Sequence, residues 1–293
     1  MARFVFSAFA DEAASDIHGQ IAALKENGIG YIEPRNINDT PILKLTDSEL
    51  EEVRRALDDA GIKVGSLGSP IGKYPIDEPF EDHLDDLKRA LYVCRVLGTD
   101  NMRMFSFFVE QDQLKDKRDE VIARMNEMCR IAKEAGVRLC HENESKIYGQ
   151  MPSEVRDLLN SIPDLYAIFD AANYRMNDAD VIDGAEATLI RPAYMHIKDA
   201  IYSTQQIVPA GEGEGRVGEV INMLNEAIDG VVYLTLEPHL HLFAAYKDID
   251  EHELKGRYRF KNNREAFDFA VKALEKLMTE NGYHKESNGE WIK

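Results

Sequence analysis

Apolar and polar positions along the chain alternate between two patterns. Short apolar runs rich in β-branched and aromatic residues are followed by polar turns and then by longer segments with helical periodicity. The apolar runs predict eight strands, at residues 4–9, 31–34, 63–66, 101–105, 138–142, 166–170, 194–198 and 232–237. A helix is expected after each strand.

The predicted helices are marked by their caps as well as by their apolar spacing. Clear examples cover residues 15–28, 46–61, 81–98, 118–136, 152–162 and 263–282, and a weaker one lies within 179–188. Thr46 and Glu49 have the spacing of a capping box. Glycines that suit left-handed C-caps stand at Gly28, Gly61, Gly98, Gly136 and Gly282.

Eight successive strand-and-helix units without a linker predict an α/β protein, a single (β/α)8 TIM barrel that forms one domain over residues 1–293. An open, doubly wound sheet is the alternative, because a count of strands does not establish that the sheet closes. The polar tail at 283–293 is expected either to be frayed or to dock through Trp291 and Ile292.

Charge and cysteine content narrow the functional classes. The chain has 53 acidic and 35 basic residues and a net charge of −18, so we expect no nucleic-acid or membrane partner. The absence of a signal region and of a long apolar run favours a soluble, cytoplasmic protein. Cys94, Cys129 and Cys140 have no CxxC spacing, so neither disulfides nor a thiolate zinc site is expected.

Nucleotide-binding motifs do not follow the predicted strands, where a Walker loop or a GxGxxG motif would stand. The glycine-rich stretch GEGEG at 211–215 carries two glutamates that would repel phosphate. We therefore expect it to be a flexible loop.

Four consecutive predicted strands carry a residue that can ligate a metal at or near the strand end. These residues are Glu142, Asp170, His196 and Glu237, on the fifth to the eighth strand. Because strand side chains alternate between two faces, the four point into the barrel while their apolar neighbours face the helices. Active sites of such barrels lie at the carboxyl ends of the strands, so we expect these side chains to meet there.

A set of three carboxylates and one imidazole would be costly to bury without a cation. A divalent metal ion removes this cost. Oxygen and nitrogen ligands without a thiolate suit Mn²⁺, Mg²⁺ or Co²⁺, and Zn²⁺ is also possible.

Four motifs in this order and spacing resemble the xylose isomerase-like TIM-barrel superfamily, which includes sugar isomerases and epimerases, inosose dehydratases and endonuclease IV nucleases. They are HENE at 141–144, FDAAN at 169–173, HIKD at 196–199 and LEPH at 236–239. The resemblance covers nearly the whole chain.

The resemblance implies a carbohydrate isomerase or epimerase that binds one divalent metal, most simply Mn²⁺, through the four strand-end residues. It also implies that Glu142 and Glu237 act as acid and base through a metal-chelated enediolate of a sugar, a sugar phosphate or an inosose. Asn173 stands where the epimerases usually have histidine, which makes it a candidate for a hydrogen bond to a sugar hydroxyl. Homo-oligomers are common in the superfamily.

Further polar residues are candidates for contacts with the substrate. Lys198 shares a face with His196 and is expected either to hold a substrate oxygen or to pair with Glu144 or another inward carboxylate. Glu144 is expected to meet Lys146, Lys198 or the substrate.

Three other residues near the strand ends have simpler alternatives. Glu33 could reach a substrate hydroxyl, although pairing with Arg35 is the simpler interpretation, and His239 is expected near the cavity mouth. Asp199 is expected to cap a turn rather than to orient the metal histidine. His141 should point away from the site, toward the helices or a turn.

Three competing functions remain open at this stage. An inosose dehydratase-type lyase would use the same enediolate, and a non-catalytic sugar-binding barrel would keep the pocket without chemistry. A nuclease is disfavoured by the acidic charge and by the presence of only eight histidines.

Overall fold

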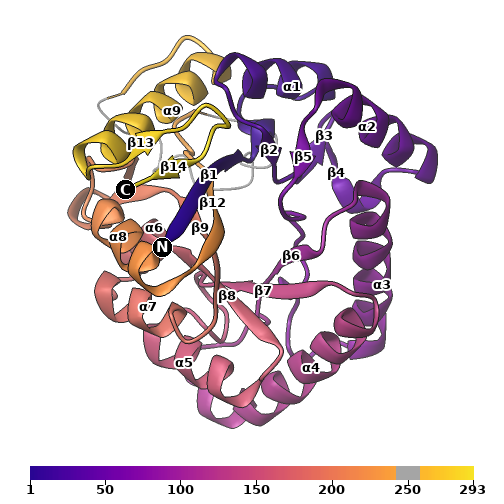
Figure 1. Cartoon of the computed structure of the whole chain (residues 1–293). Helices are drawn as coiled ribbons and strands as arrows, with labels where there is room; N and C mark the ends of the chain where they lie inside the picture. Colours follow the sequence, from indigo (N-terminus) through magenta and orange to yellow (C-terminus); the bar gives the residue numbers. More distant parts are fainter. Residues whose placement is uncertain (242–257) are drawn as a thin grey trace.

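Parallel strands form the wall of a barrel in the computed structural model, which describes residues 1–241 and 258–293 (Figure 1). The barrel strands are β1 (Ala2–Ala8), β2 (Tyr31–Ile32), β5 (Lys63–Val64), β6 (Asn101–Met104), β7 (Arg138–Glu142), β8 (Leu165–Asp170), β9 (Pro192–Ile197) and β12 (Gly230–Leu236). Six of them, in the order β1-β12-β9-β8-β7-β6, pair in parallel within one sheet.

The strands β2 and β5 close the ring. They pair with each other in parallel. The backbone N–H of Glu33, just after β2, donates to the carbonyl of Ala8 in β1 at 3.0 Å, and the N–H of Arg103 in β6 donates to Leu67, after β5, at 3.0 Å. The predicted (β/α)8 barrel is therefore confirmed, and the open-sheet alternative is wrong.

Helices surround the barrel (Figure 1). They are α1 (Ile17–Glu26), α2 (Asp47–Ala60), α3 (Phe80–Leu97), α4 (Leu114–Glu134), α5 (Pro152–Ser161), α6 (Ala171–Met176), α7 (Val181–Thr188), α8 (Val217–Ala227) and α9 (Asn263–Glu280). The predicted capping box of Thr46 and Glu49 begins α2, and Gly61 ends it in the left-handed region, at φ +71°. The short helix α6 was not predicted.

Short elements occupy the connections between strands and helices. They are the strand pairs β3 (Asn36–Ile37) with β4 (Thr40–Pro41) and β10 (Asp199–Ile201) with β11 (Gln206–Val208), and the 3-10 turns η1 (Ala10–Glu12), η2 (Ile42–Lys44) and η3 (Tyr202–Thr204). Most of them follow the carboxyl ends of barrel strands and so contribute to the side of the barrel where the site lies.

The C-terminal tail docks against the first strand. It forms β13 (His284–Lys285) and β14 (Trp291–Ile292), and β14 pairs antiparallel with β1 through Trp291 and Phe4. The buried Trp291 ring stacks on Phe6, with ring centroids 5.4 Å apart. Of the two expected outcomes for the tail, docking is therefore the one observed.

Apolar side chains on the two faces of the wall belong to separate clusters. Phe169 and Met195 pack in the core between strands and helices, whereas Ile168, Tyr194 and Cys140 form a smaller cluster inside the barrel. This separation confirms the predicted strand parity. In the described part of the chain, no helix is both long enough and apolar enough to cross a membrane.

Candidate metal centre

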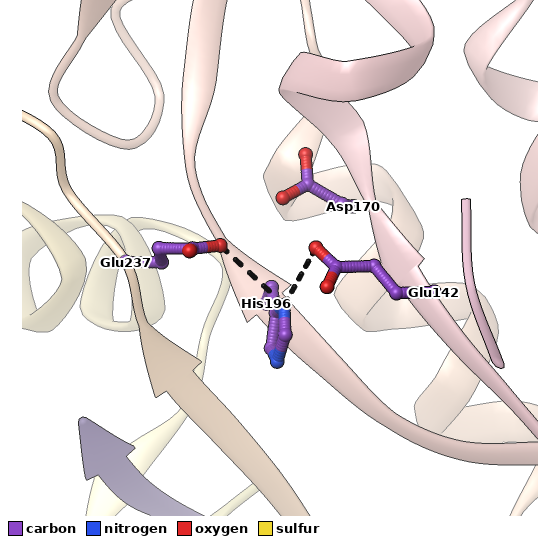
Figure 2. Close-up of side chains that lie close together, drawn as sticks. All are labelled: Glu142, Asp170, His196 and Glu237. Atoms are coloured by element: carbon purple, nitrogen blue, oxygen red, sulfur yellow. Dashed lines mark hydrogen bonds and ion pairs between the residues drawn. The ribbon is translucent and has the colours of Figure 1, made fainter. Parts of the chain in front are cut away.

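Four side chains converge at the carboxyl end of the barrel. Glu142 ends β7, Asp170 ends β8, His196 lies in β9 and Glu237 follows β12 (Figure 2). One nitrogen or oxygen atom from each lies within 4.8 Å of the others, and all four residues are buried. The strand register explains the convergence, because neighbouring parallel strands bring Asp170 beside His196 and His196 beside Thr235.

The His196 ring presents one nitrogen to this cluster. Its Nδ1 lies 3.0 Å from Glu142 Oε1 and 3.5 Å from Glu237 Oε2, so the two glutamates flank it (Figure 2). The edge of the ring packs against Phe9, with centroids 5.1 Å apart. The imidazole is therefore fixed between an aromatic wall and two carboxylates.

The other ring nitrogen of His196 faces Glu33. Its Nε2 lies 3.4 Å from Glu33 Oε2, and the Tyr194 hydroxyl donates to Glu33 Oε1 at 2.8 Å. Glu33 is fully buried and does not belong to the described lining of the cavity. The structure therefore places Glu33 beneath the cluster, where its carboxylate faces the histidine and can orient the ring. Among the described residues it forms no ion pair with Arg35, which pairs with Asp11, Glu12 and Glu237. A contact of Glu33 with a substrate hydroxyl stays a prediction.

Asp199 fixes the glycine-rich loop. Its carboxylate accepts hydrogen bonds from the backbone N–H groups of Gly211, Gly213 and Gly215, at 2.8–3.1 Å. A Cβ at Gly213 would lie 2.2 Å from Asp199 Oδ1, so only glycine allows this approach. The expected flexible loop is wrong, whereas the turn-capping role expected for Asp199 is observed.

Three cations balance the carboxylates of the cluster. Lys198 Nζ lies 3.0 Å from Asp170 Oδ2, which is one of the two alternatives expected for this lysine. Arg103 Nη1 lies 3.2 Å from Glu142 Oε2. Arg35 Nη1 donates to Glu237 Oε1 at 2.8 Å.

The two arginines were missed as site residues in the sequence. Arg103 had a usable signal, because it stands between Met102 and Met104 in β6, and strand parity sends it inward. Arg35 had no such signal, because it follows a two-residue strand.

These charges shift the pKa values of the cluster. Burial would raise the pKa of Glu142, but the positive charges of His196 and Arg103 outweigh it and lower the pKa to about 2. Burial would lower the pKa of His196, but Glu142 and Glu33 outweigh it and raise the pKa to about 10. Without a metal, His196 is therefore a cation among carboxylates, and a divalent ion would take over that role.

The donor set fits a divalent metal ion. It offers three carboxylates and one imidazole nitrogen, a set that suits Mn²⁺, Mg²⁺, Co²⁺ or Zn²⁺. The two carboxylate oxygens of Asp170 have different partners. Its Oδ1 accepts a hydrogen bond from the Asn173 N–H at 2.8 Å and so caps α6. Its Oδ2 is buried and already faces a cation, since Lys198 Nζ lies 3.0 Å away, and a metal ion would share this oxygen with the lysine or displace the lysine from it.

A second group of ligand-type residues shares Glu237. His239 Nε2 lies 3.4 Å from Glu237 Oε1 and 3.4 Å from Glu12 Oε1. Burial lowers the pKa of His239 to about 4, so its ring is neutral at pH 7. His239 thus lies at the cavity, as expected, and connects Glu12 to the cluster.

A cavity of about 360 Å³ opens above the cluster. Its described lining includes the predicted residues Glu142, Glu144, Lys198, Glu237 and His239, together with the unpredicted Arg35, Lys73, Arg103 and Phe105. The volume lies within the range of pockets for small ligands.

Asn173, Glu144 and His141 complete the predicted set. Asn173 does not belong to the described cavity lining, and its Nδ2 donates to Asn143 O at 2.8 Å and to Glu142 Oε1 at 3.5 Å. Glu144 pairs with Lys73 at 2.9 Å, rather than with Lys146 or Lys198. His141 points away from the cluster, as expected, to Ser106 Oγ at 2.8 Å.

Similar folds are found among solved structures of low sequence identity. The IolI protein with a bound zinc atom shares 15% identity at a TM-score of 0.73, over 95% of this chain and 99% of that one. D-psicose 3-epimerase from Clostridium cellulolyticum H10, solved with D-tagatose, shares 13% identity at a TM-score of 0.69, over 94% and 98%.

A fusion of a xylose isomerase-like TIM barrel with 4-hydroxyphenylpyruvate dioxygenase shares 16% identity at a TM-score of 0.71. That match covers 96% of this chain but only 43% of the fusion protein. A search of curated protein sequences finds no match. The family model described as xylose isomerase-like TIM barrel matches residues 21–280, and the chain therefore belongs to that family.

Proposed function

We propose that the protein is a divalent-metal-dependent isomerase or epimerase of a small carbohydrate. The observation that carries the proposal is the position of Glu142 and Glu237, which flank Nδ1 of His196 at 3.0 and 3.5 Å and also line the cavity. Two carboxylates on either side of one bound carbon can remove a proton from one face and return it to the same or the opposite face.

The proposed metal ligands are Glu142, Asp170, His196 and Glu237. A divalent ion held there would polarise a substrate carbonyl and its neighbouring hydroxyl, and so would acidify the C–H bond between them. Mn²⁺ is the ion to test first, because the set is rich in oxygen.

The two glutamates supply the acid and base in this proposal. Burial opposes the charge on Glu237, but the positive charge of Lys198 outweighs it and the pKa of Glu237 lies well below the usual value, so Glu237 is ionised at neutral pH, as Glu142 is. One glutamate takes the proton from carbon, which leaves an enediolate. The other glutamate has to take a proton from solvent before it can deliver one to the opposite face, and the first then releases its proton to solvent, so that no proton is gained or lost in the cycle. Lys198 remains a cation because Asp170 and Glu237 raise its pKa despite burial, and it can hold an oxygen of the substrate.

The test is proton exchange at carbon. The Mn²⁺-loaded protein is incubated with ketoses, aldoses and inososes in D₂O and followed by NMR. We expect carbon-bound deuterium in at least one panel member, with loss of exchange in Glu142→Gln and Glu237→Gln. Asp85→Asn is the matched control, since Asp85 is an exposed carboxylate that pairs with Lys88 on α3, outside the described lining of the cavity.

Other outcomes separate the alternatives. A product without carbon-bound deuterium would indicate a hydride shift in place of proton transfer. A product lighter by one water would indicate that the protein is a lyase. Ligand-dependent stabilisation without any turnover would favour a non-catalytic sugar-binding barrel. If no panel member reacts or binds, the proposal is wrong.

A further inference from the structure

The cavity has a cationic lining in an acidic protein. Arg35, Lys73, Arg103 and Lys198 belong to its described lining, although the whole chain carries a net charge of −18. The guanidinium of Arg35 is held by the protein's own carboxylates, because it makes two hydrogen bonds to Asp11 and one to Glu237. Lys198 forms ion pairs with Asp170 and Glu237. Lys73 and Arg103 are the other two cations of this lining.

Arg103 is held rigidly and keeps unused donors. Its guanidinium carbon lies 4.8 Å from the ring centre of Phe9 and 5.1 Å from that of Phe105. Its Nε donates to Ser69 O at 3.4 Å and its Nη1 to Glu142 at 3.2 Å. Within the described chain, its Nη2 has no hydrogen-bond partner, and the side chain is only 7% exposed. A mostly buried guanidinium with free donors is suited to an oxyanion.

Lys73 lies at the same aromatic ring as Arg103. Its Nζ is 4.4 Å from the ring centre of Phe105, so one ring carries both cations. The loop before Lys73 is fixed, since the N–H of Gly72 donates to His83 Nε2 at 2.9 Å. Gly72 has φ +88°, and a Cβ there would lie 1.9 Å from the carbonyl oxygen of Phe105. The ammonium group is therefore presented to the cavity by a constrained backbone.

Glu144 is the present partner of Lys73, at 2.9 Å. Its side chain is 23% exposed and that of Lys73 is 37% exposed, so this pair can open toward a ligand at small cost. A ligand anion would then share Lys73 with Glu144 and take the free donors of Arg103.

We propose that the substrate carries an anionic group, a phosphate or a carboxylate, which binds at Arg103 and Lys73. The carbonyl-bearing part of the substrate then lies over Glu142 and Glu237. This inference rests on the proposed function for the orientation of the substrate, but the anion site itself can be tested without turnover.

Binding of unreactive polyols to the Mn²⁺-loaded protein tests the anion site. Calorimetry compares D-glucitol, D-glucitol 6-phosphate and D-gluconate. Each of the two anions differs from D-glucitol in one terminal group, and none of the three compounds has a ketone. We expect at least one of the two anions to bind about tenfold or more tightly than D-glucitol. The stronger of the two identifies phosphate or carboxylate as the preferred group. Equal affinity for all three compounds would overturn the inference.

The variant Lys73→Gln separates the proposed site from general attraction to the metal. It should lower the affinity for the preferred anion by about threefold to tenfold and leave the affinity for D-glucitol unchanged. Lys88→Gln is the matched control, because Lys88 is also an exposed lysine with one carboxylate partner, Asp85 at 2.7 Å, and lies on α3 away from the cavity. Arg103→Lys keeps the charge but removes the free Nη2. It should weaken binding of the anions more than binding of D-glucitol, and any loss common to all three compounds measures its contact with Glu142. Anion binding that is unaffected in both cavity variants would contradict the proposal.

Turnover distinguishes failure of this inference from failure of the proposed function. Deuterium exchange is compared between D-fructose and D-fructose 6-phosphate, and between D-fructose and D-fructuronate. Tight anion binding that depends on Lys73, without exchange in any ketose, would support the anion site and refute the isomerase. Equal exchange in neutral and charged ketoses, with no anion preference in binding, would support the isomerase and refute the anion site.

Discussion

The two ends of the barrel differ in the chemistry of their cavities. The cavity at the carboxyl ends of the strands measures about 360 Å³, whereas one at the amino ends of β2, β5 and β6, between Tyr31, Gly65 and Thr99, measures about 740 Å³. In the described chain, both groups of ligand-type residues lie at the carboxyl end. Among the residues that the structure describes, the larger cavity therefore lacks the convergent ligand-type side chains of the smaller one, and our proposal rests on that convergence and not on cavity size.

The cause of this difference lies in the strands themselves. The strands are parallel, so all their carboxyl ends meet on one side, and short peripheral connections there can add Arg35, Lys73 and His239. At the amino end, the lining carries few charges that face one another, and Arg54 pairs with Asp58 at 2.7 Å.

The largest effect is expected for Glu142→Gln. Loss of an acid–base carboxylate should reduce deuterium exchange by about 10²- to 10⁴-fold. Asp58→Asn in the amino-end cavity should change the rate by less than about twofold, since Asp58 is exposed and far from the cluster. Initial exchange rates at saturating Mn²⁺ measure both. Similar losses in the two variants would remove the functional distinction between the ends.

Metal affinity should rise with pH by about tenfold per pH unit between roughly pH 7 and 9. The pKa of His196 is raised to about 10 without metal, so Mn²⁺ must displace one proton from the ring. Titration calorimetry in two buffers of different ionisation enthalpy should show about one proton released per ion. Affinity that does not vary with pH would show that His196 is not a ligand.

The same shift acts on the metal-free fold with the opposite sign. The pKa of His196 is about 10 in the folded protein and has the ordinary value of 6.5 in the unfolded chain. The protonated ring therefore contributes its full stabilisation below pH 6.5, and this contribution is lost as the pH rises through about 10. Raising the pH should therefore weaken the metal-free fold while it strengthens metal binding. Denaturant unfolding of metal-free protein at pH 6.5 and pH 9.5 measures this trend, and His196→Asn should reduce it.

Glu33→Gln should lower Mn²⁺ affinity by about tenfold to a hundredfold, because Glu33 orients the ring of His196. Asp100→Asn is the counterpart at the amino-end cavity and should leave the affinity unchanged. Equilibrium dialysis measures both variants. An unchanged Mn²⁺ affinity in Glu33→Gln would mean that Glu33 does not orient the metal histidine and only accepts the hydrogen bond from Tyr194.

The smallest effect is expected for Arg54→Met at the amino end. Arg54 donates to the carbonyl of Leu97 at the end of α3, at 2.6 Å, and removal of this bond should cost about 1 kcal/mol of stability. Exchange activity and metal affinity should remain those of the wild type. A loss of activity in this variant would mean that the amino end contributes to the reaction.

The four strand-end residues could be predicted because their signal is local. A strand period of two determines which side chains face inward, and parallel strands bring their ends together, so Asp170 and His196 needed no further information. Arg103 followed the same rule but was overlooked between two methionines.

Other parts of the site depend on contacts between distant segments. Glu33 and Tyr194 are 161 positions apart, and no sequence pattern indicates that one lies beneath the ring of His196. The loop at 211–215 has the composition of a flexible segment, yet the Asp199 carboxylate orders it from 12 to 16 positions away. In the same way, the docking of Trp291 depends on its pairing with Phe4 in β1, at the other end of the chain.

Anomalous diffraction from crystals soaked in Mn²⁺ tests most directly whether a metal ion binds at the carboxyl end of this barrel, as we propose. We predict one strong peak among Glu142, Asp170, His196 and Glu237, with ligand distances of about 2.0–2.3 Å. The same soak of Glu142→Gln should weaken that peak. No peak at these residues under saturating Mn²⁺, or a peak only in the amino-end cavity, would contradict the claim.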